Sequence, residues 1–147
     1  MNEAEVLDSA LELERKGFKF YTEAEIRTGN ETGKKMFAQL AKEEEQHITD
    51  IKKMFKNLYP QKSERDIPLF DVDVSEYSGE VEALRIAIDM EKKSIEFYTE
   101  WAKGNLESLF KKLIEMEEKH LELLQAELDY VRRTGFWFDY YESSMED

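Results

Sequence analysis

The sequence predicts an all-α fold, a four-helix bundle with a long crossover between its second and third helices. Apolar residues recur at helical spacing in four segments, one connection is far longer than the others, and the two halves of the chain repeat each other. No strand-like alternation persists anywhere. Because 147 residues suit one domain, we expect a single bundle over about residues 3–133 and a C-terminal tail over residues 134–147.

Each predicted helix is longer than the roughly ten to twelve residues that separate helices from strands. The first covers about residues 3–27, the second 34–58, the third 81–103 and the fourth 106–133. Their aligned apolar residues are, in order, Leu7, Leu11, Phe18 and Tyr21; Phe37, Leu40, Ile51, Met54 and Leu58; Leu84, Ile88, Ile95 and Tyr98; and Phe110, Leu113, Leu124 and Val131.

The connections between these segments predict the topology. Residues 28–33 and 104–105 are short breaks that suit antiparallel hairpins. Residues 59–79 instead form a connection of about twenty residues that contains both prolines, and Ser78 is placed to cap the third helix. A segment of that length can run back along a helix of about 35 Å. This up-down, crossover, up-down order is the ferritin-like connectivity.

An internal repeat supports two related helical hairpins. At a constant offset of 77, Leu7, Leu11, Glu14, Phe18 and Tyr21 align with Leu84, Ile88, Glu91, Ile95 and Tyr98. At an offset of 73, Phe37, Leu40, Glu44, His47 and Ile51 align with Phe110, Leu113, Glu117, His120 and Leu124.

The charge balance excludes several classes of partner. The net charge is −13 and no Lys/Arg cluster offers a phosphate-binding stripe, so neither nucleic acid nor an anionic membrane is an expected partner. The N-terminus lacks the pattern of a signal peptide, and no apolar run approaches the roughly 18 residues of a membrane span. A cytoplasmic protein is therefore expected. The absence of cysteine excludes thiolate metal sites and cysteine nucleophiles.

Polar residues interrupt the apolar seam of every helix at corresponding positions. The first and third helices each carry one acid there, and the second and fourth each carry a Glu-x-x-His pair; the residues are Glu14, Glu91, Glu44, His47, Glu117 and His120. Residues three apart on a helix present neighbouring side chains on one face. Nearby acids fall off the seam, and most of them are expected on the solvated surface; they include Glu12, Glu43, Glu45, Glu115 and Glu118.

Four buried carboxylates need compensating positive charge, and no seam position carries Lys or Arg. One Glu from each of two helices with Glu-x-x-His from the other two is the ligand arrangement of di-iron and di-manganese bundles. Both histidines of the chain fall in this motif, which favours a metal site over a polar core satisfied without metal. Carboxylate with imidazole suits Fe or Mn, with Zn also possible.

Aromatic residues add two further expectations. Tyr21 and Tyr98 follow Glu14 and Glu91 by two helical turns, and they either donate hydrogen bonds to the ligand carboxylates or serve as core aromatics with satisfied hydroxyls. The aromatic tail after Gly135 is expected to pack against its own bundle or to form a dimer interface.

The sequence resembles the rubrerythrin family of ferritin-like di-iron proteins. The resemblance rests on Glu14-x6-Tyr21, Ala41-x-x-Glu44-x-x-His47, Glu91-x6-Tyr98 and Leu113-x3-Glu117-x-x-His120, and covers roughly residues 3–133. It implies a di-iron centre with Glu14, Glu91, His47 and His120 as terminal ligands and Glu44 and Glu117 as bridges. Two features depart from the peroxidases of the family: the four cysteines of a rubredoxin domain are absent, and Ser94 stands near the position of an additional Glu.

Three functions fit such a site. The first is an oxidoreductase that reduces peroxide or O2 with electrons from a separate donor, with the chain as a homodimer. The second is iron oxidation for storage, which predicts a shell assembly. The third is a structural metal site without turnover.

Overall fold

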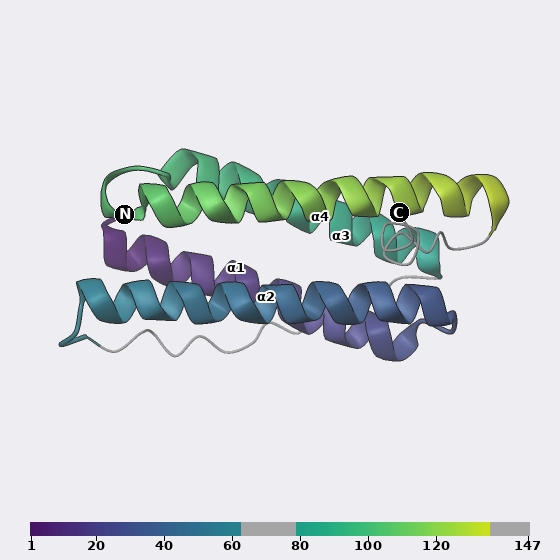
Figure 1. Cartoon of the computed structure of the whole chain (residues 1–147), viewed down its shortest axis with the longest axis horizontal. Helices are drawn as coiled ribbons and strands as arrows, with labels where there is room; N and C mark the ends of the chain where they lie inside the picture. Colours follow the sequence, from purple (N-terminus) through teal and green to yellow (C-terminus); the bar gives the residue numbers. More distant parts are fainter. Residues whose placement is uncertain (63–78, 136–147) are drawn as a thin grey trace, which may run out of the picture.

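The computed structural model describes residues 1–62 and 79–135, and within them it is built of helices (Figure 1). The four long helices are α1 (Glu3–Arg27), α2 (Glu31–Leu58), α3 (Glu80–Trp101) and α4 (Glu107–Thr134). A short 3-10 turn, η2 (Gly104–Leu106), leads directly into α4. The predicted all-α fold is confirmed.

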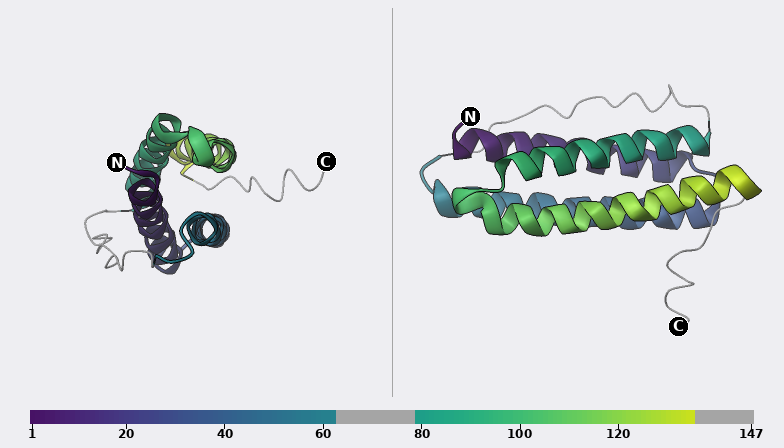
Figure 2. Two further views of the ribbon diagram at one scale, coloured as in Figure 1. Left: turned by 90° about the vertical axis from the view of Figure 1, so that its left-hand side faces the viewer. Right: turned by 90° about the horizontal axis from the view of Figure 1, so that it is seen from above.

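The helices form two hairpins that lie against each other. α1 packs on α2 and α3 packs on α4, and further contacts join α1 to α3 and α2 to α4 (Figure 2). α2 ends and α3 begins at opposite ends of the bundle (Figure 1). This is the predicted ferritin-like order. Residues 63–78 of the crossover and the aromatic tail 136–147 lie outside the described residues.

The helix boundaries follow from their caps. The Asn2 side chain accepts a hydrogen bond from the Glu5 N–H, and Asn30 accepts one from the Gly33 N–H, so α2 begins at Glu31 and not at residue 34. The predicted cap of α3 by Ser78 is wrong. Gly79 occupies the N-cap position at a φ of 97°, which suits glycine, and no side chain caps this end.

The core consists of two apolar clusters, each built from all four long helices. One gathers around Phe20, Phe37, Leu84 and Leu124, and the other around Leu7, Ile51, Tyr98 and Phe110. Four residues of the predicted seam, Phe18, Met54, Leu58 and Ile95, are only half-buried. Phe20, two residues beyond Phe18, is fully buried instead.

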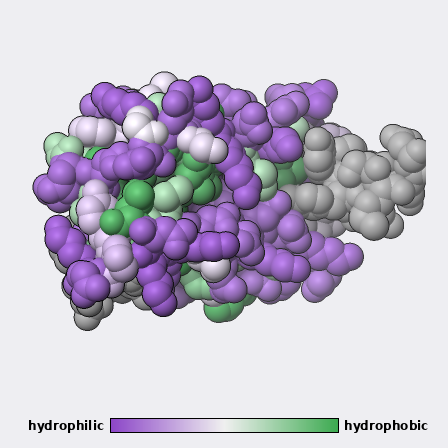
Figure 3. Space-filling view, turned by 60° about the vertical axis from the view of Figure 1, so that its left-hand side comes forward, coloured by the Kyte–Doolittle hydropathy of each residue, from purple (hydrophilic) through white to green (hydrophobic). Residues whose placement is uncertain are grey.

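Charged side chains dominate the outside of the bundle. Figure 3 shows a mostly hydrophilic face with small apolar patches. Among the described large apolar residues only Met1 and Ile26 are exposed. None of the helices in residues 1–62 and 79–135 has the length and apolar character that crossing a bilayer requires.

Candidate metal centre

The six polar seam residues meet between the two apolar clusters. Each lies in the sequence between residues of one cluster and residues of the other, as Glu14 does between Leu11 and Phe20. The set is almost fully removed from solvent, with exposed fractions of 1–3% for Glu14, Glu44, His47, Glu91, Glu117 and His120. The helical seams thus deliver one polar layer across an otherwise apolar core.

Within this layer the side chains form two ligand groups. The first, group A, contains Glu14, Glu44, His47 and Glu117; the second, group B, contains Glu44, Glu91, Glu117 and His120. In each group the four ligand atoms lie within 4.8 Å of one another. Glu44 and Glu117 belong to both groups. Two neighbouring ions, each with one terminal Glu, one His and two shared carboxylates, fit this arrangement.

His47 faces group A through its Nδ1 atom. This nitrogen lies 2.9 Å from Glu117 Oε1, 3.3 Å from Glu14 Oε2 and 3.8 Å from Glu44 Oε2. The His120 ring lies opposite, with ring centroids 5.9 Å apart and planes 19° from parallel. The Nδ1 atoms of both imidazoles lie within 4.0 Å of the shared carboxylates of Glu44 and Glu117.

His120 faces group B, also through Nδ1, which lies 3.5 Å from Glu44 Oε1 and 3.6 Å from Glu91 Oε1. Its other nitrogen, Nε2, is 3.0 Å from Glu43 Oε2. Glu43 is therefore an exception among the off-seam acids, most of which are expected on the solvated surface, because its side chain is only 28% exposed and turns toward α4. The helical period of the sequence places Glu43 beside the seam. Its contact with His120 depends on how α4 packs against α2, which the sequence does not give.

The two tyrosines connect the hairpins. The Tyr21 hydroxyl donates to Glu91 Oε1 at 2.5 Å, and the Tyr98 hydroxyl donates to Glu14 Oε1 at 2.6 Å. Each tyrosine thus bonds the acid of the other hairpin. Burial, reinforced by the negative charge of Glu91 at Tyr21 and of Glu14 at Tyr98, raises the pKa of each hydroxyl well above its usual value, so both remain donors.

Replacing Tyr98 with Phe is expected to lower the free energy of unfolding by about 1.5–3 kcal/mol, because a buried carboxylate loses a charge-assisted hydrogen bond. Urea unfolding followed by circular dichroism measures the change. Tyr59→Phe, at a half-buried tyrosine beyond the end of α2, is the matched control and should change stability by less than about 0.5 kcal/mol. Equal losses in both variants would contradict a specific role for the Tyr98 hydroxyl.

Three observations indicate that this set of donor atoms suits metal ions. Buried His120 Nδ1, Glu91 Oε2 and Glu117 Oε1 have no hydrogen-bond partner in the described part of the chain. None of the side chains buried in residues 1–62 and 79–135 is Lys or Arg, so these basic residues do not neutralise the acids from within the core. Gly17 lines the site, since a Cβ there would stand 3.4 Å from Glu44 Oε2. Oxygen and imidazole donors without a proton partner are what a hard or borderline divalent ion binds.

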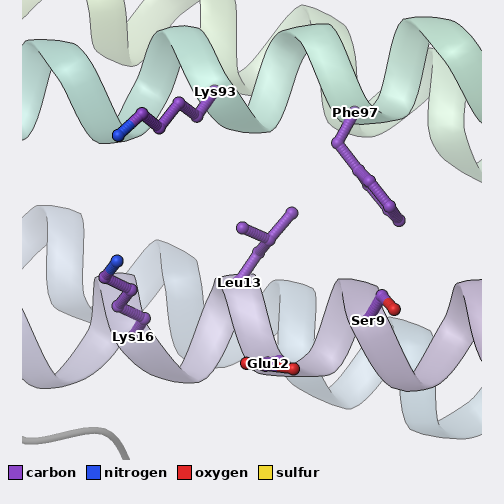
Figure 4. A pocket seen from close by; sticks show the side chains of 6 residues that line it. All are labelled: Ser9, Glu12, Leu13, Lys16, Lys93 and Phe97. Atoms are coloured by element: carbon purple, nitrogen blue, oxygen red, sulfur yellow. The ribbon is translucent and has the colours of Figure 1, made fainter.

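Other features lie near this layer without joining it. A pocket of about 440 Å³ opens between α1 and α3, lined by Ser9, Glu12, Leu13, Lys16, Lys93 and Phe97 (Figure 4). Leu13 and Phe97 adjoin Glu14 and Tyr98 in the sequence, but none of the six Glu and His residues of the polar layer lines the pocket. Glu127, 1% exposed in α4, is a buried acid that sequence reasoning missed.

The fold and the site define the class of the protein: a ferritin-like four-helix bundle whose core carries a Glu/His cluster that can bind metal. The rubrerythrin family matches the chain over residues 5–128, and the chain belongs to this family. Membership implies a di-iron site.

One solved structure, a hypothetical protein from Pyrococcus furiosus, is similar to this chain with 23% sequence identity and a TM-score of 0.79. The match covers 90% of this chain and 92% of that chain, which shows a shared fold. No curated protein matches the chain.

Proposed function

We propose that this rubrerythrin-family protein is a cytoplasmic di-iron oxidoreductase that reduces peroxide or O2. The observation that supports a two-ion centre is the sharing of Glu44 and Glu117 between groups A and B. In this proposal Glu14 and His47 are the terminal ligands of one ion and Glu91 and His120 those of the other. Iron, manganese and zinc all accept this donor set, so the choice of iron rests on the family.

Two bound Fe(II) ions would supply the two electrons that, with two protons, convert one H2O2 into two water molecules. The chain's own residues would hold the reaction site in shape. Tyr21 and Tyr98 fix the orientation of Glu91 and Glu14 through their short hydrogen bonds. The apolar clusters on either side of the layer exclude bulk water, which strengthens every charge interaction within it.

The proposal includes two partners. After one turnover the centre would have given up both electrons, and the absence of cysteine excludes an iron–sulfur cluster in this chain, so a separate electron donor would have to reduce it. We also propose a homodimer. Sizing chromatography tests this directly, because a dimer excludes the large shell that an iron-storage protein needs.

Stopped-flow mixing tests the proposed reaction. Protein loaded with two Fe(II) per chain under anaerobic conditions is mixed with H2O2 or with O2, and the absorbance of the oxidised centre is followed. We expect rapid oxidation with one H2O2 consumed per two Fe(II), because each peroxide accepts two electrons. Zn-loaded protein is the control and should consume no peroxide, since Zn²⁺ has no accessible redox change.

Two outcomes would contradict this function. If neither oxidant oxidises the Fe(II) protein faster than it oxidises free Fe(II), the site is structural. If iron uptake continues well beyond two ions per chain and the protein elutes as a shell, iron storage is the better description.

A further inference from the structure

The two histidines of the centre differ in the contacts of their outer nitrogens. His120 Nε2 lies 3.0 Å from Glu43 Oε2, whereas the buried His47 Nε2 has no hydrogen-bond partner within residues 1–62 and 79–135. The internal repeat explains the difference: at the offset of 73 that relates the two histidines, Glu43 corresponds to Met116. A thioether is only a weak acceptor. The two halves of the repeat thus carry the same candidate ligands but differ in the residue that can support the ligand histidine.

The Glu43 contact fixes the chemical form of His120. A partly exposed carboxylate is ionised at neutral pH and can only accept a hydrogen bond, so the proton of this contact belongs to Nε2. The inner nitrogen, Nδ1, faces group B, 3.5 Å from Glu44 Oε1, and is the atom that would bind a metal ion there in exchange for its proton. A carboxylate behind a ligand imidazole also raises the basicity of the ligand nitrogen.

His47 lacks this support. Its Nδ1 faces the acids of group A, at 2.9 Å from Glu117 Oε1, but no acceptor within the described residues holds the opposite side of its ring. A metal ion in group A therefore depends on a histidine whose tautomer and orientation are less constrained.

We infer that the two metal positions are inequivalent and that Glu43 is the positioning residue that makes group B the tighter one, so that ions fill group B first. The inference rests on the proposed two-ion centre. Removal of such an outer partner typically weakens metal binding by about 10- to 100-fold, which sets the size of the expected effect.

Titration with Co²⁺ tests this on the full chain after its metal has been removed with a chelator. Calorimetry gives the affinity of each step, and the visible ligand-field absorption of Co²⁺ gives its environment. For the wild type we expect two resolved steps of one ion each. Glu91→Gln should remove the tighter step, because Glu91 belongs to group B alone, and Glu14→Gln should remove the weaker one.

The decisive variant is Glu43→Ala. It should weaken the first step by about 10- to 100-fold and leave the second within about threefold, so that the two steps merge. Glu43→Gln keeps an oxygen acceptor for Nε2–H and should restore most of the affinity, which a purely structural loss would not do. The matched control is Glu45→Ala, at an exposed acid of the same helix, and it should change neither step. Met116→Glu should strengthen the second step.

Three results would overturn the inference. The first is two equal sites in the wild type. The second is a Glu43→Ala variant in which neither step weakens or both steps weaken. Either result would remove the special role of Glu43 while leaving the two-ion centre intact. Failure of the wild-type protein to bind Co²⁺ at all would overturn both this inference and the metal centre of the proposed function. Circular dichroism of each variant confirms that the helices are retained.

Discussion

Replacing Glu44 and Glu117 together with glutamine is expected to abolish binding of both metal ions, whereas replacing Glu14 or Glu91 alone should remove one. The reason is the membership of the ligand groups. Glu44 and Glu117 serve groups A and B, while Glu14 belongs only to A and Glu91 only to B. A neutral amide keeps the volume of the side chain but loses the charge that a bridge between two cations requires.

Metal analysis of the purified variants measures this effect as ions per chain. The wild type should hold two, Glu14→Gln and Glu91→Gln one each, and the double variant close to none. Glu118→Gln replaces an exposed acid next to Glu117 and should retain both ions. The assignment of bridges would be wrong if the double variant kept one ion, or if Glu14→Gln lost both.

The second large effect is on stability, which should respond to pH in opposite directions with and without metal. Burial, and then repulsion by Glu14, raises the pKa of Glu44; burial, and then repulsion by Glu44, raises the pKa of Glu117. Burial alone would lower the pKa of His47, but the Glu117 and Glu14 carboxylates beside its Nδ1 outweigh burial and raise that pKa to about 12. In metal-free protein these groups bind more protons folded than unfolded.

The direction follows from linkage. The contribution of His47 is fully present below its ordinary pKa of 6.5 and is lost as pH rises toward 12, and the two raised carboxyls destabilise the fold increasingly above their ordinary value of 4.5. Glu14 and Glu91 act oppositely below pH 4.5. Burial alone would raise the pKa of each, but the neighbouring Glu44 and His47 outweigh burial for Glu14 and lower its pKa. The neighbouring Glu117 and His120 do the same for Glu91. Metal-free protein should therefore lose stability between about pH 5 and 9. Metal binding needs deprotonated ligands, so the loaded protein gains stability over the same range.

Thermal unfolding between pH 5 and 9, with a chelator or with bound metal, measures both slopes. Each ion adds about 2.7 kcal/mol when free metal is 100-fold above Kd, and two such ions should raise Tm by roughly 10–20 °C near neutral pH. The control is metal-free Glu44→Gln/Glu117→Gln, which retains the general repulsion of the acidic chain but lacks the two raised carboxyls. If its stability falls with pH as steeply as that of the wild type, the buried acids are not the cause.

The periodicity of the chain was sufficient to predict the helices and their order. Apolar residues at helical spacing predict α1 to α4 to within three residues at each end, because an amphipathic helix in a bundle has only one way to bury its apolar stripe. The differences lie at the caps, where one side chain decides: Asn30 starts α2 three residues early, and Gly79 takes the place expected for Ser78. Periodicity also did not predict that Phe20 is buried and Phe18 only half-buried, because the neighbouring helices decide which residue at the edge of the apolar stripe is covered.

The sequence by itself therefore determined that Glu14, Glu44, His47, Glu91, Glu117 and His120 share one layer, because a repeat that places charged residues in an apolar seam at equal heights leaves them no other environment. Tertiary structure alone decided the partners within that layer. Tyr21 and Tyr98 bond across the hairpins to Glu91 and Glu14, and Glu43 reaches His120 from beside the seam. The physical reason is that helical spacing specifies the face of a helix on which a side chain lies, whereas a hydrogen bond of about 2.5–3 Å depends on how the helices are placed against each other.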